Sequence, residues 1–145
     1  MTKELRRKLQ RLATRYKRIN EEMKQYQEEV KQRWGNTEAY RQSKERTKHW
    51  TKEDYERIKR EGNAFTKRLA DAMGKDIASK EVQTLVEQHH KGIETFYDCP
   101  YEMYRKLGEL YVSDKRFTAY YDKFRPGLAA WLKQAIDYYC DAHAK

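Results

Sequence analysis

Eight apolar residues near the N-terminus of the chain recur at alternating spacings of four and three positions. A pattern with this seven-residue repeat forms one narrow stripe on an α-helix, which must be covered by another helix. The sequence therefore predicts one long helix. Its stripe either pairs two chains in a coiled coil or packs against the chain's own domain. The residues, called the seam below, are Leu5, Leu9, Leu12, Tyr16, Ile19, Met23, Tyr26 and Val30.

The segment that carries the seam is strongly basic. Residues 1–33 contain eleven lysines and arginines against five glutamates, which gives +6 of the net charge of +9. The cations surround the seam and do not form one broad patch with aromatic stacking groups. We therefore expect a solvated charged face and no direct nucleic-acid site in this segment.

Residues that build hydrophobic cores are unevenly distributed. Leu, Ile, Val and Phe make up 22 of the 145 residues, and only six of them lie in residues 1–60. The C-terminal part can therefore bury a core with help from Tyr, Trp and Met, whereas the N-terminal part cannot fold alone. We divide the chain into a basic heptad helix, residues 1–33, and a helical domain, residues 34–145.

Helix-capping residues mark the starts of the remaining helices, and no useful strand alternation occurs, so the predicted fold is all-α. We expect helices at the following places: from Asn36 or Thr37 to about Lys48, from Thr51 with Asp54 in a capping box to about Met73 before Gly74, after Ser79 along an apolar face reaching Phe96, from Pro100 capped by Asp98 or Cys99 to about Val112, after Asp114, and from Pro126.

Aromatic residues gather around these helix starts between residues 93 and 130. So many rings around short helices predict either a core built from rings or a cleft lined with them. They are Phe96, Tyr97, Tyr101, Tyr104, Tyr111, Phe117, Tyr120, Tyr121 and Phe124.

Three glycines, Gly62, Gly92 and Gly108, lie inside helical patterns, where each costs about 1 kcal/mol relative to alanine. Two explanations fit: close helix crossing, and room for a bulky ligand against bare backbone.

His89 and His90 are adjacent, so on a helix they point about 100° apart and cannot chelate one metal ion. We place His89 in the core. His90, on the same side as Tyr97, is expected to line a cleft.

No zinc spacing, phosphate loop or nucleophile–base motif is present, so we expect neither a cofactor, haem included, nor catalysis. The two cysteines do not suggest a disulfide framework, and no apolar run approaches a membrane span. We therefore expect a cytoplasmic protein.

Three segments resemble the TipAS antibiotic-recognition domain, the effector-binding part of some MerR-type transcription activators. They are Trp34–Ser43, Thr51–Tyr55 and Ile93–Ala130, within a resemblance that covers roughly residues 26–139. It implies a small globin-like helical domain that binds thiopeptide antibiotics or other bulky apolar drugs. It also implies a dimerisation stem, and hence a homodimer through residues 5–30, with DNA contacted only through a reading head that this chain lacks.

In the family, the cysteine that bonds covalently to the ligand lies about two helical turns after the Tyr-Asp-Cys motif, and here Lys106 takes that place. Cys99, at a predicted helix start, is the alternative nucleophile because helix amides lower a thiol pKa. We expect non-covalent binding.

We therefore predict a ligand-sensing domain of a MerR-type regulator, or a stand-alone form that sequesters drug. Residues 20–50 are expected to order over the ligand. The alternative is a structural module that assembles through its coiled-coil helix. The predicted ligand-binding residues are Trp34, Tyr40, His90, Phe96, Tyr97, Cys99, Tyr101, Tyr104 and Tyr111.

Overall fold

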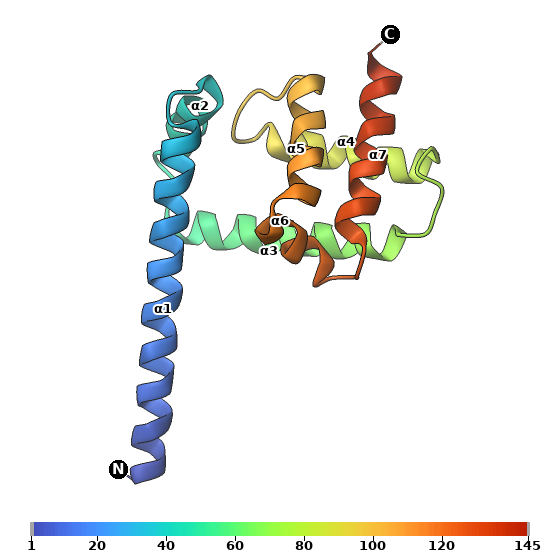
Figure 1. Cartoon of the computed structure of the whole chain (residues 1–145). Coiled ribbons are helices and arrows are strands. Elements are labelled where there is room, and N and C mark those ends of the chain that lie inside the picture. The colour runs from blue at the N-terminus through green and yellow to red at the C-terminus, as the bar shows by residue number, and fades with distance from the viewer. Residues whose placement is uncertain (1, 145) are drawn as a thin grey trace. The chain divides into compact units, whose positions relative to one another are not determined.

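All regular structure between residues 2 and 144, which the computed structural model describes, is helical (Figure 1). The all-α prediction is confirmed. Contacts divide the chain into an N-terminal unit, residues 1–41, and a C-terminal unit, residues 42–145. None of the helices in the described residues is long and apolar enough to cross a membrane. The helices are α1 (Lys3–Trp34), α2 (Glu38–Thr47), α3 (Lys52–Ala72), α4 (Lys80–Ile93), α5 (Tyr101–Ser113), α6 (Lys115–Asp122) and α7 (Leu128–His143).

The N-terminal unit consists mainly of α1, which is one continuous helix over the whole predicted seam. The Thr2 hydroxyl caps it by accepting a hydrogen bond from the Leu5 amide at 3.1 Å. None of its described side chains is buried, and the seam residues from Leu5 to Tyr26 are exposed by 37 to 69 %. The long helix is thus confirmed. Its apolar stripe lies at the surface.

Four of the predicted helix caps are present. Each side-chain oxygen accepts a hydrogen bond from a backbone amide two or three residues later. This bond satisfies one of the N–H groups in the first helical turn that have no carbonyl partner within the helix. In α3 the cap is reciprocal, because the amide of Thr51 also donates to the Asp54 carboxylate at 2.8 Å. The capping residues are Thr37, Thr51, Ser79 and Asp114.

The predicted starts of α5 and α7 are wrong by one or two residues. Pro100 itself occupies the cap position of α5 without a side-chain cap, so neither Asp98 nor Cys99 caps that helix. The Asp98 carboxylate is instead bound by α2, as described below. Gly127 precedes α7 with a φ of 88°, and this left-handed residue separates Pro126 from the helix.

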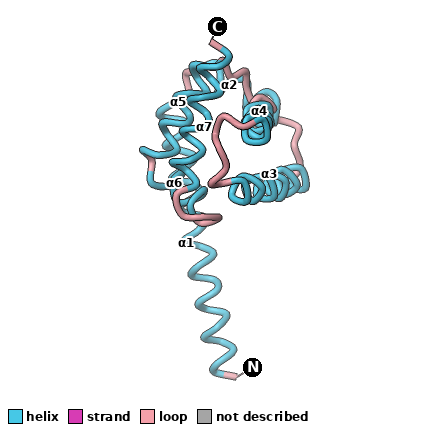
Figure 2. Tube along the Cα trace, turned by 90° about the vertical axis from the view of Figure 1, so that its right-hand side faces the viewer, coloured by secondary structure: helices cyan, strands magenta, loops and turns pink. Residues whose placement is uncertain are grey.

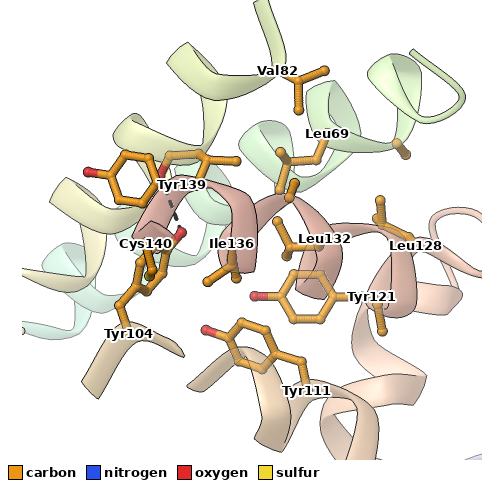
Figure 3. Packing of buried hydrophobic residues seen from close by; sticks show 14 of the residues in the cluster. Leu69, Val82, Tyr104, Tyr111, Tyr121, Leu128, Leu132, Ile136, Tyr139 and Cys140 are labelled. Carbon is orange, nitrogen blue, oxygen red and sulfur yellow. Dashed lines mark hydrogen bonds between the residues drawn. The ribbon is translucent and has the colours of Figure 1, made fainter. Parts of the chain in front are cut away.

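Two layers make up the C-terminal unit. α3 and α4 form one layer, and α5, α6 and α7 cross it on one face (Figures 1 and 2). α7 packs against α3, α4, α5 and α6. Burying each large apolar side chain contributes about 2 kcal/mol, so this helix is the main source of core stability. Its buried residues include Leu128, Leu132, Ile136 and Tyr139 (Figure 3).

Candidate functional site

A groove with a volume of about 620 Å³ lies in the C-terminal unit. Its walls come from α3, α4, the turn after α4 and the tyrosines of α6. This volume falls within the range of about 300 to 1,000 Å³ that is typical of small-molecule sites. The apolar and aromatic lining residues are Ile58, Phe65, Ile93, Phe96, Tyr97, Tyr120 and Tyr121.

Two glycines give this groove walls of bare backbone. A Cβ atom added at Gly62 on α3 or at Gly92 on α4 would meet no atom within 4 Å, so no other helix crosses closely at either glycine. At Gly108, in contrast, a Cβ would lie 3.4 Å from Cγ2 of Ile136 on α7. Close crossing therefore explains Gly108, whereas Gly62 and Gly92 keep space open in the groove.

His89 forms part of the groove and is held by two tyrosines. The Tyr104 hydroxyl donates its one hydrogen bond to the Val86 carbonyl at 3.3 Å, so it accepts a hydrogen bond from the N–H at Nδ1 of His89 at 2.7 Å. Nε2 then accepts from the Tyr121 hydroxyl at 3.1 Å. An Nε2 atom that accepts a hydrogen bond belongs to a neutral ring, which agrees with the pKa of this histidine. Burial lowers the pKa of His89 to about 4, with a smaller contribution from the neighbouring His90.

His90 points away from the groove into the core. Its Nε2 donates to the Cys99 carbonyl at 2.6 Å, and its Nδ1 lies 3.0 Å from the Tyr139 hydroxyl. Only 6 % of the residue is exposed. The assignment of His90 to a cleft is thus wrong, and His89, which packs among buried tyrosines, is the histidine that reaches the groove. Among residues 2–144, no group of three His, Cys, Asp or Glu side chains could hold a metal ion.

The turn after α4 places Phe96 and Tyr97 in the groove. α4 ends at Ile93, so Phe96 does not continue the helix face as predicted. The Phe96 ring packs against Trp50, with ring centroids 5.4 Å apart. Burial raises the pKa of the Tyr97 hydroxyl well above its usual range, so this hydroxyl stays protonated.

A clasp from the C-terminal half of α2 holds this turn. Arg46 donates to the Glu94 carbonyl at 3.0 Å and to the Asp98 carboxylate at 2.7 Å. Gln42 accepts from the Asp98 amide at 2.8 Å and donates to its carboxylate at 3.3 Å. The Arg46 contact lowers the pKa of Asp98. These four contacts, called the clasp below, fix one wall of the groove from helix α2.

Cys99 lies in an environment that suppresses its reactivity. Only 2 % of the residue is exposed. Burial, with smaller effects of Glu94 and Cys140, raises the pKa of its thiol to about 12. The expectation that helix amides lower this pKa is wrong because desolvation outweighs them.

Four of the predicted ligand-binding residues lie in or behind the groove. Phe96 and Tyr97 line it. Tyr104 and Tyr111 are buried behind it, where Tyr104 binds His89 and the ring of Tyr111 lies 6.0 Å from that of His89. These two tyrosines support the site without lining it.

The other aromatic candidates lie elsewhere. Tyr101 is 40 % exposed and stacks on His143 at the end of α7, with centroids 5.1 Å apart. Trp34 and Tyr40 belong to the N-terminal unit, where the Arg33 guanidinium lies 4.7 Å from the Trp34 ring centroid. Ligand contact by these residues stays a prediction.

Several lining residues were not singled out from the sequence. Ile58 and Phe65 lie on α3, and Tyr120 belongs to the aromatic group between residues 93 and 130, which the sequence does not divide between core and cleft. A signal was present, because Gly62 lies on the same face as Ile58 and Phe65. A glycine centred on an apolar helix face indicates missing volume there.

Comparison with known proteins agrees with this architecture. A solved structure of TipAS from Streptomyces lividans in complex with nosiheptide superposes with a TM-score of 0.76 at 47 % identity, covering 84 % of this chain and 87 % of that chain. The antibiotic-binding domain of a TipA-class multidrug-resistance regulator superposes with a TM-score of 0.57 at 40 % identity, covering 61 % of this chain and 98 % of that one.

Sequence relatives include the HTH-type transcriptional activator TipA of Streptomyces coelicolor, 50 % identical over 77 % of this chain and 46 % of the relative. The activator mta of Bacillus subtilis is 33 % identical over 86 % of this chain and 49 % of the relative. The chain thus spans about half the length of these curated relatives. The model of the TipAS antibiotic-recognition domain matches residues 26–139, and the chain belongs to this family.

Proposed function

We propose that this chain binds bulky, ring-rich antibiotics of the thiopeptide class in the groove between α3 and α4. It would serve as the effector-binding part of a MerR-type transcriptional regulator, or as a stand-alone form that sequesters the drug. The observation that carries the proposal is the open space at Gly62 and Gly92 beside the rings of Phe65, Phe96 and Tyr97. Aromatic walls stack on heteroaromatic rings, and bare backbone lets a wide ligand approach closely.

Binding is non-covalent in this proposal, and the ligand is not turned over. The thiolate is the reactive form of cysteine, and a thiol with a pKa of about 12 in a buried position supplies almost none of it. Lys106, at the place of the family's bonding cysteine, is exposed and has an amine in place of a thiol. The family is a ligand-binding part of regulators and not an enzyme family.

The seam pairs two copies of the chain as a homodimer through residues 5–30. The charged residues beside the seam favour antiparallel helices. In the seven-residue repeat abcdefg, with the seam at positions a and d, such helices bring residues at position g opposite residues at position g of the partner. Pairing Leu5 with Val30 and Tyr16 with Ile19 of the second copy buries the whole seam. The same alignment places Arg15 opposite Glu22 and Lys8 opposite Glu29. Parallel helices in register would bring none of these opposite charges together.

Ligand binding is coupled to the N-terminal segment through residues 20–50, which gain order when the groove is filled. The clasp supports this step because it joins Gln42 and Arg46 of α2 to the turn that lines the groove. Trp34 and Tyr40 would add contacts to the ligand. Ordering residues 20–50 costs conformational entropy, which lowers the affinity for the ligand. It also means that the N-terminal segment becomes ordered only when ligand is bound.

Calorimetric titration with nosiheptide tests the groove. The full chain should bind, and Gly62→Leu should weaken binding at least about tenfold, because its side chain enters the groove where no atom now lies within 4 Å. Arg60→Leu is the matched control: it adds the same side chain to an exposed position of α3 outside the groove lining.

Binding by the control and loss in Gly62→Leu would support the proposal. Equal affinity in both variants would place the ligand elsewhere. No binding by the unmodified chain would remove the drug-binding function and leave the seam, and hence an assembly module, as the main feature.

A further inference from the structure

The first half of α1 concentrates the positive charge of the chain. Residues 5–20 contain seven lysines and arginines and no aspartate or glutamate, so they carry +7 of the net +9. All of these residues are exposed. In the part of the chain that the structure describes, none of the seven cations forms an ion pair. Arginines four residues apart, such as Arg7 and Arg11, repel each other, so an external anion would stabilise this segment.

Three of the arginines face away from the seam. With the seam at heptad positions a and d, Arg7 is at position f, and Arg11 and Arg18 are at position c. Together with Gln10, Thr14 and Arg15 they line a continuous strip along α1, called the arginine strip below. Pairing of the seam with a second copy leaves positions c and f exposed, so Arg7, Arg11 and Arg18 stay accessible in a dimer.

The chemistry of the strip favours phosphate. Guanidinium groups bind phosphate oxygens in a bidentate manner, and Gln10 and Thr14 add neutral hydrogen-bond donors between them. Arg7 and Arg11 are separated by a rise of about 6 Å and Arg11 and Arg18 by about 10 Å, which spreads the charges along a straight rod. Such a row can follow the closely spaced phosphates of double-stranded DNA, which carries about one charge per 1.7 Å of its axis.

A membrane surface fits the same segment less well. Interfacial helices bury a broad apolar face, usually with Trp or Phe in it. Residues 5–20 contain neither Trp nor Phe, and their apolar residues form the narrow seam that a second helix would cover.

We propose that the arginine strip binds the phosphate backbone of double-stranded DNA independently of base sequence. This function goes beyond ligand binding in the groove and does not depend on it. It also departs from the expectation that the basic face of α1 is only solvated. Phosphate contacts of this kind give affinity and orientation but no sequence information.

The test measures binding of the full chain to a short DNA duplex by fluorescence anisotropy at several salt concentrations. Three phosphate contacts contribute about 2.7 to the slope of log K against log salt, at about 0.9 each. The triple variant Arg7→Gln, Arg11→Gln, Arg18→Gln should reduce the slope by that amount. The matched control, Lys52→Gln, Lys59→Gln, Lys67→Gln, removes the same charge from exposed positions of α3 and should leave the slope unchanged.

Circular dichroism should show unchanged helix content in both triple variants, and nosiheptide affinity should also stay the same. Equal losses in the two variants would mean that only net charge matters, which overturns the proposal. Stronger binding to phosphatidylserine vesicles or to single-stranded RNA than to duplex DNA would overturn it as well. Retention of the slope in Arg7→Lys, Arg11→Lys, Arg18→Lys would support phosphate binding by charge at these positions.

Discussion

Single glycine residues distinguish the groove from the core. The sequence showed that Gly62, Gly92 and Gly108 interrupt helices, but not which of them accommodates a neighbouring helix. That distinction depends on what lies opposite each backbone position, which is known only once the helices are packed. Ile136 lies opposite Gly108, and open space lies opposite the other two.

Alanine substitutions at these three glycines should therefore differ in how much they stabilise the protein. Gly62→Ala and Gly92→Ala should each raise the free energy of unfolding by about 0.5 to 1 kcal/mol, because alanine loses less backbone entropy in a helix. Gly108→Ala should raise the free energy of unfolding by less, since its Cβ would lie 3.4 Å from Cγ2 of Ile136 and Ile136 would have to adjust. Urea unfolding measures all three. Equal stabilisation by all three would contradict the packing at Gly108.

His89 should make stability depend on pH. Its folded pKa of about 4 lies below the unfolded value of about 6.5, so only the unfolded chain takes up a proton as the pH falls between them. The stabilisation is complete above about pH 6.5 and is lost towards about pH 4. Between pH 7 and pH 5 the chain should lose about 2 kcal/mol more than the His89→Gln variant in urea unfolding. Identical losses would show that His89 titrates normally in the folded protein.

At the scale of the helices, starts marked by a capping side chain were predictable, and the end of α4 was not. A capping residue acts through its own sequence neighbours, so Thr51 with Asp54 and Ser79 were recognisable from local sequence. The end of α4 at Ile93 depends on distant residues, because α2 holds the following turn through Arg46. Contacts between residues about fifty positions apart leave no local pattern.

Removing the clasp should loosen the turn that lines the groove. Arg46→Gln removes the ion pair with Asp98 and weakens the bond to the Glu94 carbonyl. Amide hydrogen exchange at Asp98 and Cys99 should become faster, whereas exchange in α7 should stay the same. Arg41→Gln, which breaks an exposed ion pair with Glu38 on the same helix, is the control. If both variants leave exchange at the turn unchanged, the clasp does not hold it.

The proposed antiparallel pairing of α1 can be tested by exchanging charges. Arg15→Glu or Glu22→Lys alone should weaken the dimer, because each places like charges opposite one another across the seam. The double variant restores opposite charges and should recover dimerisation in sedimentation equilibrium. Failure of the double variant to recover would contradict this register.

For the molecule as a whole, the family and the all-helical fold were predictable from the sequence, and the groove was not. Motifs such as Tyr97-Asp98-Cys99-Pro100 are continuous in sequence, and apolar residues concentrate in the C-terminal part. The groove combines α3, α4, the turn after α4 and α6, and its lining depends on the exact rotation of each helix. For this reason the aromatic candidates divided between the groove, the core behind it and other surfaces.

The central claim is that a bulky antibiotic occupies this groove without bonding to the protein. Amide hydrogen exchange of the full chain with and without nosiheptide, followed by the intact mass of the same sample, tests it most directly. We predict slower exchange in residues 58–66 and 92–97 and in residues 20–50, with no change in mass after denaturation. Unchanged exchange around Gly62 and Gly92, or a mass increase equal to the ligand, would contradict the account.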